Sequence, residues 1–158
     1  MDIRAALRGA WVVVPAILAD RITKIWALME TPRFTVVPGV FGVRFARNTG
    51  AAFSMLSSAP WLVSALSVAL IIAVMAVLVT DRKMDKWTRL GLWLVVAGGL
   101  GNVYDRLAYG FVVDMIEVLF VDFAIFNVAD ICVCCGAFLA AAAMIFSDMK
   151  QKKTTEGA

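Results

Sequence analysis

The chain has 158 residues, of which 62% are hydrophobic and only 17% are charged, and its formal net charge is +3. Soluble domains are closer to half apolar and a quarter charged, so this composition excludes an ordinary soluble domain. The length is that of one domain and leaves no room for a large soluble unit beside several membrane spans. The basic residues form no cluster with aromatic ones, and we therefore expect no nucleic-acid partner.

Four stretches of the chain are long and apolar enough to cross a bilayer, which takes about 20 residues of helix. The second carries no charged side chain from residue 61 to residue 80, whereas acidic or basic residues interrupt or flank the other three. We predict an all-α membrane protein with four transmembrane helices in a single domain that covers residues 1–158. The predicted spans are residues 10–29, 60–80, 88–107 and 127–146.

The N-terminal segment resembles a signal peptide, because Arg4 and Arg8 precede an apolar run. However, the segment lacks the small-residue cleavage site of such peptides, and charged residues at positions 20, 21 and 24 fall inside the apolar run. We therefore expect this segment to be retained as the first span.

The loop after the first span, residues 31–59, has the character of paired strands. Residues 35–37 have high strand propensity, Pro38 and Gly39 are typical of a turn, and apolar residues then occupy alternate positions 41, 43 and 45. We predict a short β-hairpin or cradle on the outer side of the membrane.

Basic residues in short loops mark the cytoplasmic side of a membrane protein. They occur in the N-terminal tail, between the second and third predicted spans, and in the C-terminal tail. With four spans, these three segments fall on one side, so we expect both termini in the cytoplasm. The charge asymmetry is incomplete, because the first outer loop also contains Arg33, Arg44 and Arg47.

Ionisable residues in or beside membrane spans are costly, and each marks a candidate functional site. Asp20 and Lys24 are one helical turn apart and can pair, either as a structural ion pair or as a group that holds substrate or lipid. Asp105 and Arg106 are neighbours that cannot face each other on a helix, so each needs another partner. For Arg106 the alternative is a long side chain that reaches the membrane interface.

Asp114 and Asp130 are candidate catalytic residues. Asp114 follows the third predicted span and Asp130 begins the fourth, so two antiparallel spans would bring both carboxylates to one depth near the outer interface. Two close carboxylates in a low-dielectric site do not ionise together readily, so one can serve as a base while the other keeps its proton. Hydrolysis of a peptide bond by water needs such a base and such an acid. Spacing alone leaves open that these are two unrelated interfacial aspartates.

Small residues in the last two spans have competing explanations. Glycines in the third span allow helices to approach closely or leave space for an extended peptide, and the sequence does not decide between these; they are Gly98, Gly99 and Gly101. The cysteines in the fourth span are interpreted as small packing residues, because a metal site needs more ligands and the chain has no histidine; they are Cys132, Cys134 and Cys135.

Four motifs of the chain resemble those of the lipoprotein signal peptidases. Residues 20–24 (Asp-Arg-Ile-Thr-Lys) are similar to the D-x-x-[ST]-K motif of the family's first span. Residues 47–54 are similar to its outer-loop motif, residues 98–106 with 110–114 to its third-span block, and residues 126–130 to its fourth-span block. Each motif alone is weak, but all four occur in family order on four predicted spans. Glu117, where many members have aspartate, is a peripheral departure.

The resemblance implies a bacterial cytoplasmic-membrane enzyme, signal peptidase II. Such an aspartic endopeptidase removes the signal peptide from prolipoproteins that carry a diacylglyceryl-modified cysteine, cutting just before that cysteine. The resemblance also implies inhibition by globomycin and no metal or organic cofactor. It implies that Asp114 and Asp130 form the catalytic pair. Nine other residues are implied to shape the site or contact substrate: Asp20, Lys24, Asn48, Gly50, Asn102, Asp105, Arg106, Asn127 and Ala129.

Two other classes of protein fit part of the same pattern. A small proton-coupled transporter would also carry Asp and Lys within its spans, but it would show two related halves and a site at the midplane. The sequence has no such repeat, and its polar residues gather toward one side. A non-enzymatic chaperone for signal helices would keep its binding activity without either carboxylate.

Overall fold

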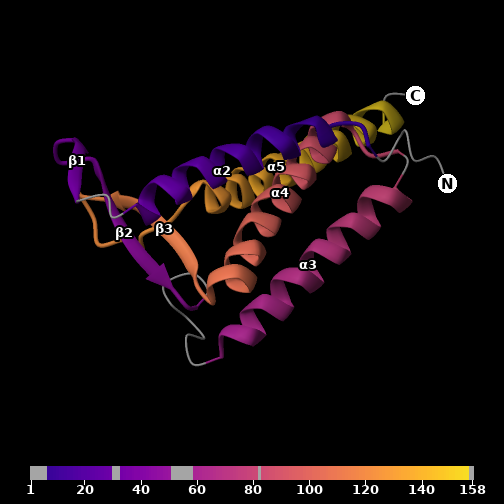
Figure 1. Ribbon diagram of the computed structural model, residues 1–158. Helices are drawn as coiled ribbons and strands as arrows, with labels where there is room; N and C mark the ends of the chain where they lie inside the picture. Colours follow the sequence, from indigo (N-terminus) through magenta and orange to yellow (C-terminus); the bar gives the residue numbers. More distant parts are fainter. Residues whose placement is uncertain (1–6, 30–32, 51–58, 82, 157–158) are drawn as a thin grey trace.

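The computed structural model describes residues 7–29, 33–50, 59–81 and 83–156 of the chain. Four helices and a small antiparallel sheet make up this part (Figure 1). The predicted loop motif is only partly covered, because residues 51–54 lie outside the described residues. In chain order the elements are η1 (Ala10–Val12), α2 (Val13–Leu28), β1 (Phe34–Val37), β2 (Phe41–Asn48), α3 (Pro60–Thr80), α4 (Lys86–Tyr109), β3 (Val112–Val118) and α5 (Val128–Glu156).

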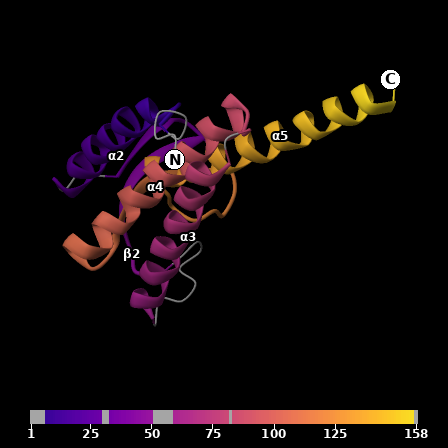
Figure 2. The ribbon, with the colours of Figure 1, turned by 90° about the vertical axis from the view of Figure 1, so that its right-hand side faces the viewer.

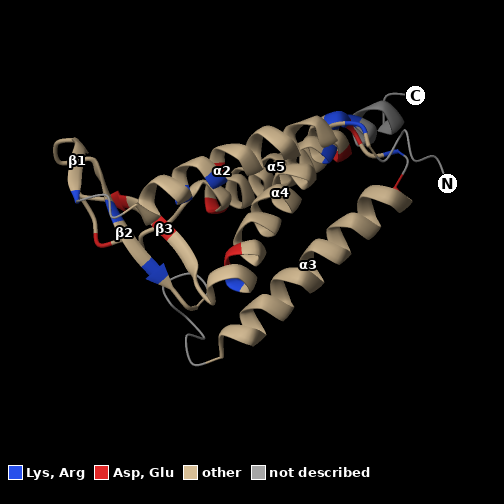
Figure 3. Cartoon of the chain, in the orientation of Figure 1, with Lys and Arg blue, Asp and Glu red and all other residues tan. Residues whose placement is uncertain are grey.

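Helices α2, α4 and α5 pack against one another, and α3 packs against α4 but diverges from α2 and α5 (Figure 1). The sheet lies at one end of this bundle, and the C-terminal end of α5 lies at the other. Turned by 90°, α5 is seen to extend well past its neighbours (Figure 2). Acidic and basic residues lie at these two ends and also on α2, α4 and the start of α5, while α3 is uncharged along its length (Figure 3).

Two of the described helices are long and apolar enough to cross a membrane: Pro60–Thr80, and Val128–Lys150 within α5. Helix α2 is shorter, with 16 residues, and it contains charged residues. Helix α4 also carries charged residues, near its sheet end. These charges are mostly buried, with Asp20, Lys24 and Asp105 at most 1% exposed. Because they lie inside the bundle, the outer faces of α2 and α4 can remain apolar.

The sheet contains the predicted hairpin and one strand that was not predicted. Strands β1 and β2 pair as an antiparallel hairpin, and Gly39 takes a left-handed φ of 72° in the turn. Strand β3 pairs with β2 on its other edge, placing Asp114 opposite Ala46. The sequence of β3 lacks the alternation of a half-exposed strand, because its first four residues are all buried.

Helix α4 begins two residues before its predicted start and ends two residues after its predicted end. The early start has a local cause, since the Asp85 carboxylate accepts hydrogen bonds from the amides of Trp87 and Thr88. Arg89 then joins this end to α3 by donating to the carbonyl oxygens of Leu78 (3.0 Å) and Asp81 (2.9 Å). These bonds satisfy carbonyls that the end of a helix leaves unpaired.

Close contact between helices explains the glycines at positions 98 and 101 of α4. A side chain at Gly98 would collide with the carbonyl oxygen of Ala129, and one at Gly101 would lie 2.7 Å from Oδ2 of Asp20. Gly99 instead faces Ile71 of α3 and lines a cavity. Close packing therefore accounts for Gly98 and Gly101, and a side chain at Gly99 would lie only 3.0 Å from Ile71 at the wall of the cavity.

Candidate active site

The two predicted catalytic aspartates come together where β3 and the start of α5 meet. Asn127, the residue just before α5, contacts both of them. Its side-chain amide donates to Oδ1 of Asp114 at 2.6 Å, and its backbone amide donates to Oδ2 of Asp130 at 3.1 Å. Asn127 and Asp114 are 0% and 2% exposed. The fold thus brings Asp114 and Asp130 together, which their spacing in the sequence had left open.

A reciprocal cap fixes the Asp130 carboxylate at the start of α5. Oδ1 of Asn127 accepts from the Asp130 amide at 2.9 Å, while the Asp130 carboxylate accepts from the Asn127 amide. This is the capping-box arrangement, in which the residue before a helix and the third helical residue satisfy each other's amides. The helix start also favours a negative charge at this position.

Two further asparagines direct the remaining carboxylate oxygens. Asn102 of α4 donates to Oδ1 of Asp130 at 2.7 Å, and Asn48 of β2 donates to Oδ2 of Asp114 at 3.0 Å. Oδ1 of Asn102 accepts from Lys24 at 2.8 Å and from Asn127 at 3.2 Å. Within the described residues, each carboxylate oxygen therefore has one donor, and these donors are neutral groups.

Behind the asparagines lies a buried cluster of two carboxylates and two cations. Nζ of Lys24 lies 3.1 Å from Oδ2 of Asp20 and 2.8 Å from Oδ2 of Asp105. Arg21 completes the charge balance, with its guanidinium 2.7 Å from Asp20 and 2.6 Å from Asp105. Tyr104 lies against this guanidinium, 4.8 Å from ring centroid to Cζ.

The ion cluster holds the backbone beside each catalytic aspartate. Oδ2 of Asp105 accepts from the amide of Val113 at 3.1 Å, and Oδ1 of Asp20 accepts from the amide of Ala129 at 3.0 Å. Val113 and Ala129 are the residues immediately before Asp114 and Asp130. The two anions of the cluster therefore set the positions of two otherwise separate chain segments.

Arg21 was missed as a site residue in the sequence analysis. Its partner Asp105 is 84 residues away, so helical spacing offers no sign of their contact. The one available signal was the excess of acid, because a single Lys24 cannot neutralise both Asp20 and Asp105. The predicted Asp20–Lys24 pair is confirmed, as is the need of Asp105 for a partner away from Arg106.

Arg106 and Gly50 border the site on the side of β2. Nη2 of Arg106 donates to the carbonyl oxygen of Gly50 at 2.7 Å, and the Gly50 amide donates to Oδ1 of Asn48 at 2.9 Å. Arg106 is therefore linked to Asn48 through the backbone of Gly50. All the predicted site residues lie in this connected region, and Ala129 contributes its backbone amide.

A cavity of about 520 Å³ opens beside Asp130 between α3, α4 and α5. Polar residues line its end near the sheet, and apolar residues of the three helices line the rest. Cys134 and Cys135 also line it, while Cys132 does not, so two of the three cysteines face this space instead of only filling the helix packing. Its polar lining is Asn48, Ser67, Asn102, Arg106 and Asp130.

Burial raises the pKa of Asp114, and the charge of Asp130 raises it further. Hydrogen bonds from Asn48 and Asn127 offset part of this increase, so that the pKa is about 6, compared with 3.8 for a free carboxyl. Asp114 can therefore hold a proton at a pH at which an ordinary aspartate is ionised. A carboxyl that exchanges a proton near neutral pH, next to a second carboxylate, can serve in acid–base hydrolysis.

The raised pKa of Asp114 predicts that folding is less favourable at neutral than at acidic pH. Between pH 3.8 and about 6 the unfolded chain has lost this proton while the folded protein retains it, so the folded state loses stability as pH rises. The contribution of this one carboxyl is on the order of 3 kcal/mol. Thermal unfolding in detergent at pH 4.5 and 7 should show a smaller decrease for Asp114→Asn than for the unchanged protein. An equal decrease in both proteins would contradict the assignment.

A mostly helical membrane protein that holds one carboxylate at the wall of a cavity, and a second beside it through a shared asparagine, has the groups that acid–base hydrolysis needs. Comparisons with known proteins agree. The sequence model of the Peptidase_A8 family, described as signal peptidase (SPase) II, matches residues 12–146. The chain therefore belongs to the signal peptidase II family and is an aspartic protease.

Individual relatives support this assignment over most of the chain. A lipoprotein signal peptidase of Clostridium acetobutylicum is 36% identical over 146 residues, which cover 89% of this chain and 95% of the relative. One of Streptococcus pyogenes serotype M6 is 39% identical over 125 residues, covering 76% and 81%. Two solved structures of a bacterial membrane enzyme, obtained by the in meso method at 2.3 and 1.9 Å, superpose with TM-scores of 0.82 and 0.78, each at 28% identity. They cover 89% and 86% of this chain, and the alignments span 88% and 91% of those chains.

Proposed function

We propose that this protein removes signal peptides from diacylglyceryl-modified prolipoproteins, cutting just before the lipidated cysteine. The observation that carries the proposal is the bridge made by Asn127, which places the Asp114 and Asp130 carboxylates at one site. Family membership supplies the reaction, and the relatives are named for the same class of substrate. The whole chain acts as one membrane-embedded peptidase domain without a metal or organic cofactor.

In this mechanism the two aspartates share the proton transfers of peptide hydrolysis. The ionised carboxylate removes a proton from a water molecule, whose oxygen attacks the scissile carbonyl carbon. The protonated carboxyl donates a hydrogen bond to the carbonyl oxygen as negative charge develops there. When the C–N bond breaks, a proton passes to the departing amine, and the products are a carboxylic acid and a free amine. The raised pKa of Asp114, at about 6, fits a pair in which one carboxyl holds a proton near neutral pH while the other is ionised.

The other site residues position this pair and the substrate. Asn48, Asn102 and Asn127 orient the carboxylates, and the ion cluster of Asp20, Arg21, Lys24 and Asp105 fixes the backbone behind them. Arg106, Gly50 and the cavity beside Asp130 offer polar groups and apolar walls to an extended peptide and its lipid. Globomycin, as an inhibitor of the family, is expected to occupy the same cavity.

A lipid anchor on the substrate should strongly increase the rate of cleavage. A site at the membrane surface meets mainly the molecules that are held there, and anchoring turns a bimolecular search into an effectively local one. Purified protein in lipid vesicles should therefore shorten a diacylglyceryl-modified prolipoprotein at least about tenfold faster than the same precursor without the lipid. Equal rates would refute the role of the anchor, and no cleavage of either precursor would refute the proposed function.

We also propose four membrane spans in a bacterial cytoplasmic membrane, with both termini in the cytoplasm and the aspartates near the outer face. The basic residues at both ends and between α3 and α4 support this orientation. The test replaces the native cysteines by alanine and then introduces one cysteine at a time, at position 44 or 83. An impermeant maleimide applied to intact cells should distinguish the two positions. Arg44→Cys should be labelled, and Lys83→Cys only after permeabilisation; the opposite pattern would invert the topology.

A further inference from the structure

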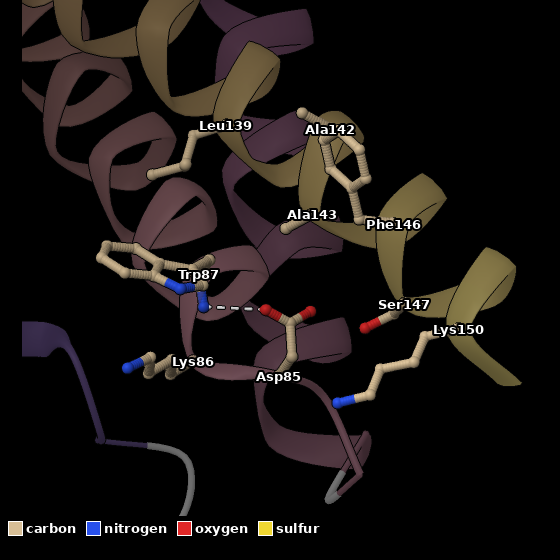
Figure 4. Close-up of a pocket in the computed structure, with 9 residues that line it drawn as sticks. All are labelled: Asp85, Lys86, Trp87, Leu139, Ala142, Ala143, Phe146, Ser147 and Lys150. Atoms are coloured by element: carbon tan, nitrogen blue, oxygen red, sulfur yellow. Dashed lines mark hydrogen bonds between the residues drawn. The ribbon is translucent and has the colours of Figure 1, made fainter.

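A second cavity lies at the end of the bundle away from the aspartates, between the start of α4 and the last turns of α5 (Figure 4). Its volume is about 600 Å³. Peptide hydrolysis makes no use of this end of the molecule. Nine of the described residues line the cavity: Asp85, Lys86, Trp87, Leu139, Ala142, Ala143, Phe146, Ser147 and Lys150.

The walls of this cavity are apolar and the space between them is open. In Figure 4, Trp87 of α4 lies on one side and Phe146 of α5 on the other, with Ala143 between them. Trp87 and Phe146 are 52% and 68% exposed, so neither side chain is covered by the protein. Helix α5 extends past its neighbours (Figure 2), and the apolar side chains of Met144 and Ile145 on it are 57% and 60% exposed. Such a slot suits a hydrocarbon chain.

Basic groups lie at the edge of the same cavity. Nζ of Lys86 lies 5.0 Å from the ring centroid of Trp87, and the Lys150 side chain extends from α5 toward the start of α4 (Figure 4). Asp85 is the one acidic residue that the described part of the chain adds to the lining. Its carboxylate is turned into the helix start, where it accepts hydrogen bonds from the amides of Trp87 (2.8 Å) and Thr88 (3.0 Å). Among the described residues, the lining therefore holds two lysines and one aspartate, and the positive charge is in excess.

We propose that this cavity binds one anionic phospholipid, with the phosphate near Lys86 and Lys150 and an acyl chain between Trp87 and the face of α5. A soluble anion would use only the two ammonium groups and would leave the apolar walls in water. A neutral lipid would use only the walls. An anionic lipid matches both, and a tryptophan beside lysines at a helix end is typical of a membrane interface. This site is independent of the proposed peptidase activity.

The binding of phosphatidylglycerol to the intact purified protein tests the proposal. Native mass spectrometry should detect one tightly held phosphatidylglycerol and much weaker binding of phosphatidylcholine with the same acyl chains. Lys86→Gln and Lys150→Gln should each weaken phosphatidylglycerol binding about fivefold, the effect of about 1 kcal/mol per basic residue at an anionic surface. Lys83→Gln is the matched control, because this lysine is exposed nearby but does not line the cavity; its binding should stay within about twofold of the unchanged protein.

A second variant tests the acyl slot while it keeps both lysines. Ala143→Phe should fill the space between Trp87 and Phe146 and weaken phosphatidylglycerol binding at least about fivefold, with thermal unfolding in detergent close to that of the unchanged protein. Inorganic phosphate at millimolar concentration should not displace the lipid. The proposal is overturned if phosphatidylcholine binds equally well, if Lys83→Gln weakens binding as much as Lys86→Gln, or if phosphate alone competes fully. Unchanged binding by a folded Ala143→Phe variant would also overturn it.

Discussion

Asp114→Asn and Asp130→Asn are each expected to reduce cleavage of lipidated prolipoprotein at least about a thousandfold. Either change removes a group that must give or take a proton, while the size of the side chain is preserved. The double variant should be little slower than either single variant, because residues that act as a unit do not contribute additively. Single-turnover cleavage rates in detergent measure all three effects.

The same variants separate catalysis from folding and binding. An amide at either position removes one of two neighbouring negative charges, so thermal unfolding should not reveal a large loss of stability. Globomycin and uncleaved substrate should still bind. Asp148→Asn, at an exposed position of α5, is the matched control and should cleave normally. Near-normal cleavage by a folded Asp114→Asn or Asp130→Asn variant would refute the assignment. If neither the variants nor the unchanged protein cleaves the substrate, yet all of them bind it, a chaperone would be favoured instead.

Lys24→Met is expected to cause a large loss of stability, unlike the changes in the catalytic pair. Lys24 is 1% exposed and contacts Asp20, Asp105 and Asn102. Its removal leaves Arg21 as the one cation against two buried carboxylates, and breaking a buried pair in this way costs about 3–5 kcal/mol. For a chain of this size the unfolding temperature should decrease on the order of 10 °C. Cleavage should also slow, because Asn102 loses the donor that helps to orient it toward Asp130.

Two further variants make the Lys24 prediction specific. Lys83→Met removes an exposed lysine of the α3–α4 connection and should leave the unfolding temperature within about 1 °C. Adding Asp20→Asn to Lys24→Met removes one anion together with the cation, so part of the lost stability should return. The amide oxygen of the new asparagine can still accept from the Ala129 amide. A double variant less stable than Lys24→Met alone would contradict charge balance as the cause.

Local patterns in the sequence were sufficient to predict several elements of the fold. The uncharged apolar run predicted α3, and the Pro38-Gly39 turn between strand-forming residues predicted the β1–β2 hairpin, because both features depend on neighbouring residues. The Asp20–Lys24 pair was also predictable, since one helical turn separates the two side chains. Strand β3 was missed because its start is buried on both faces, so the alternation that identifies a surface strand is absent.

The sequence by itself determined that this is a strongly hydrophobic protein with several helices, in which a small set of polar residues lies within or beside the predicted spans. Its motifs also indicated which two aspartates form the candidate catalytic pair. The tertiary structure alone decided how they are held. Asn127 bridges Asp114 and Asp130, and Arg21 joins Asp105 across 84 residues of chain. The physical reason is that a buried charge or amide must find a partner wherever packing brings one, and sequence separation does not limit which partner that is.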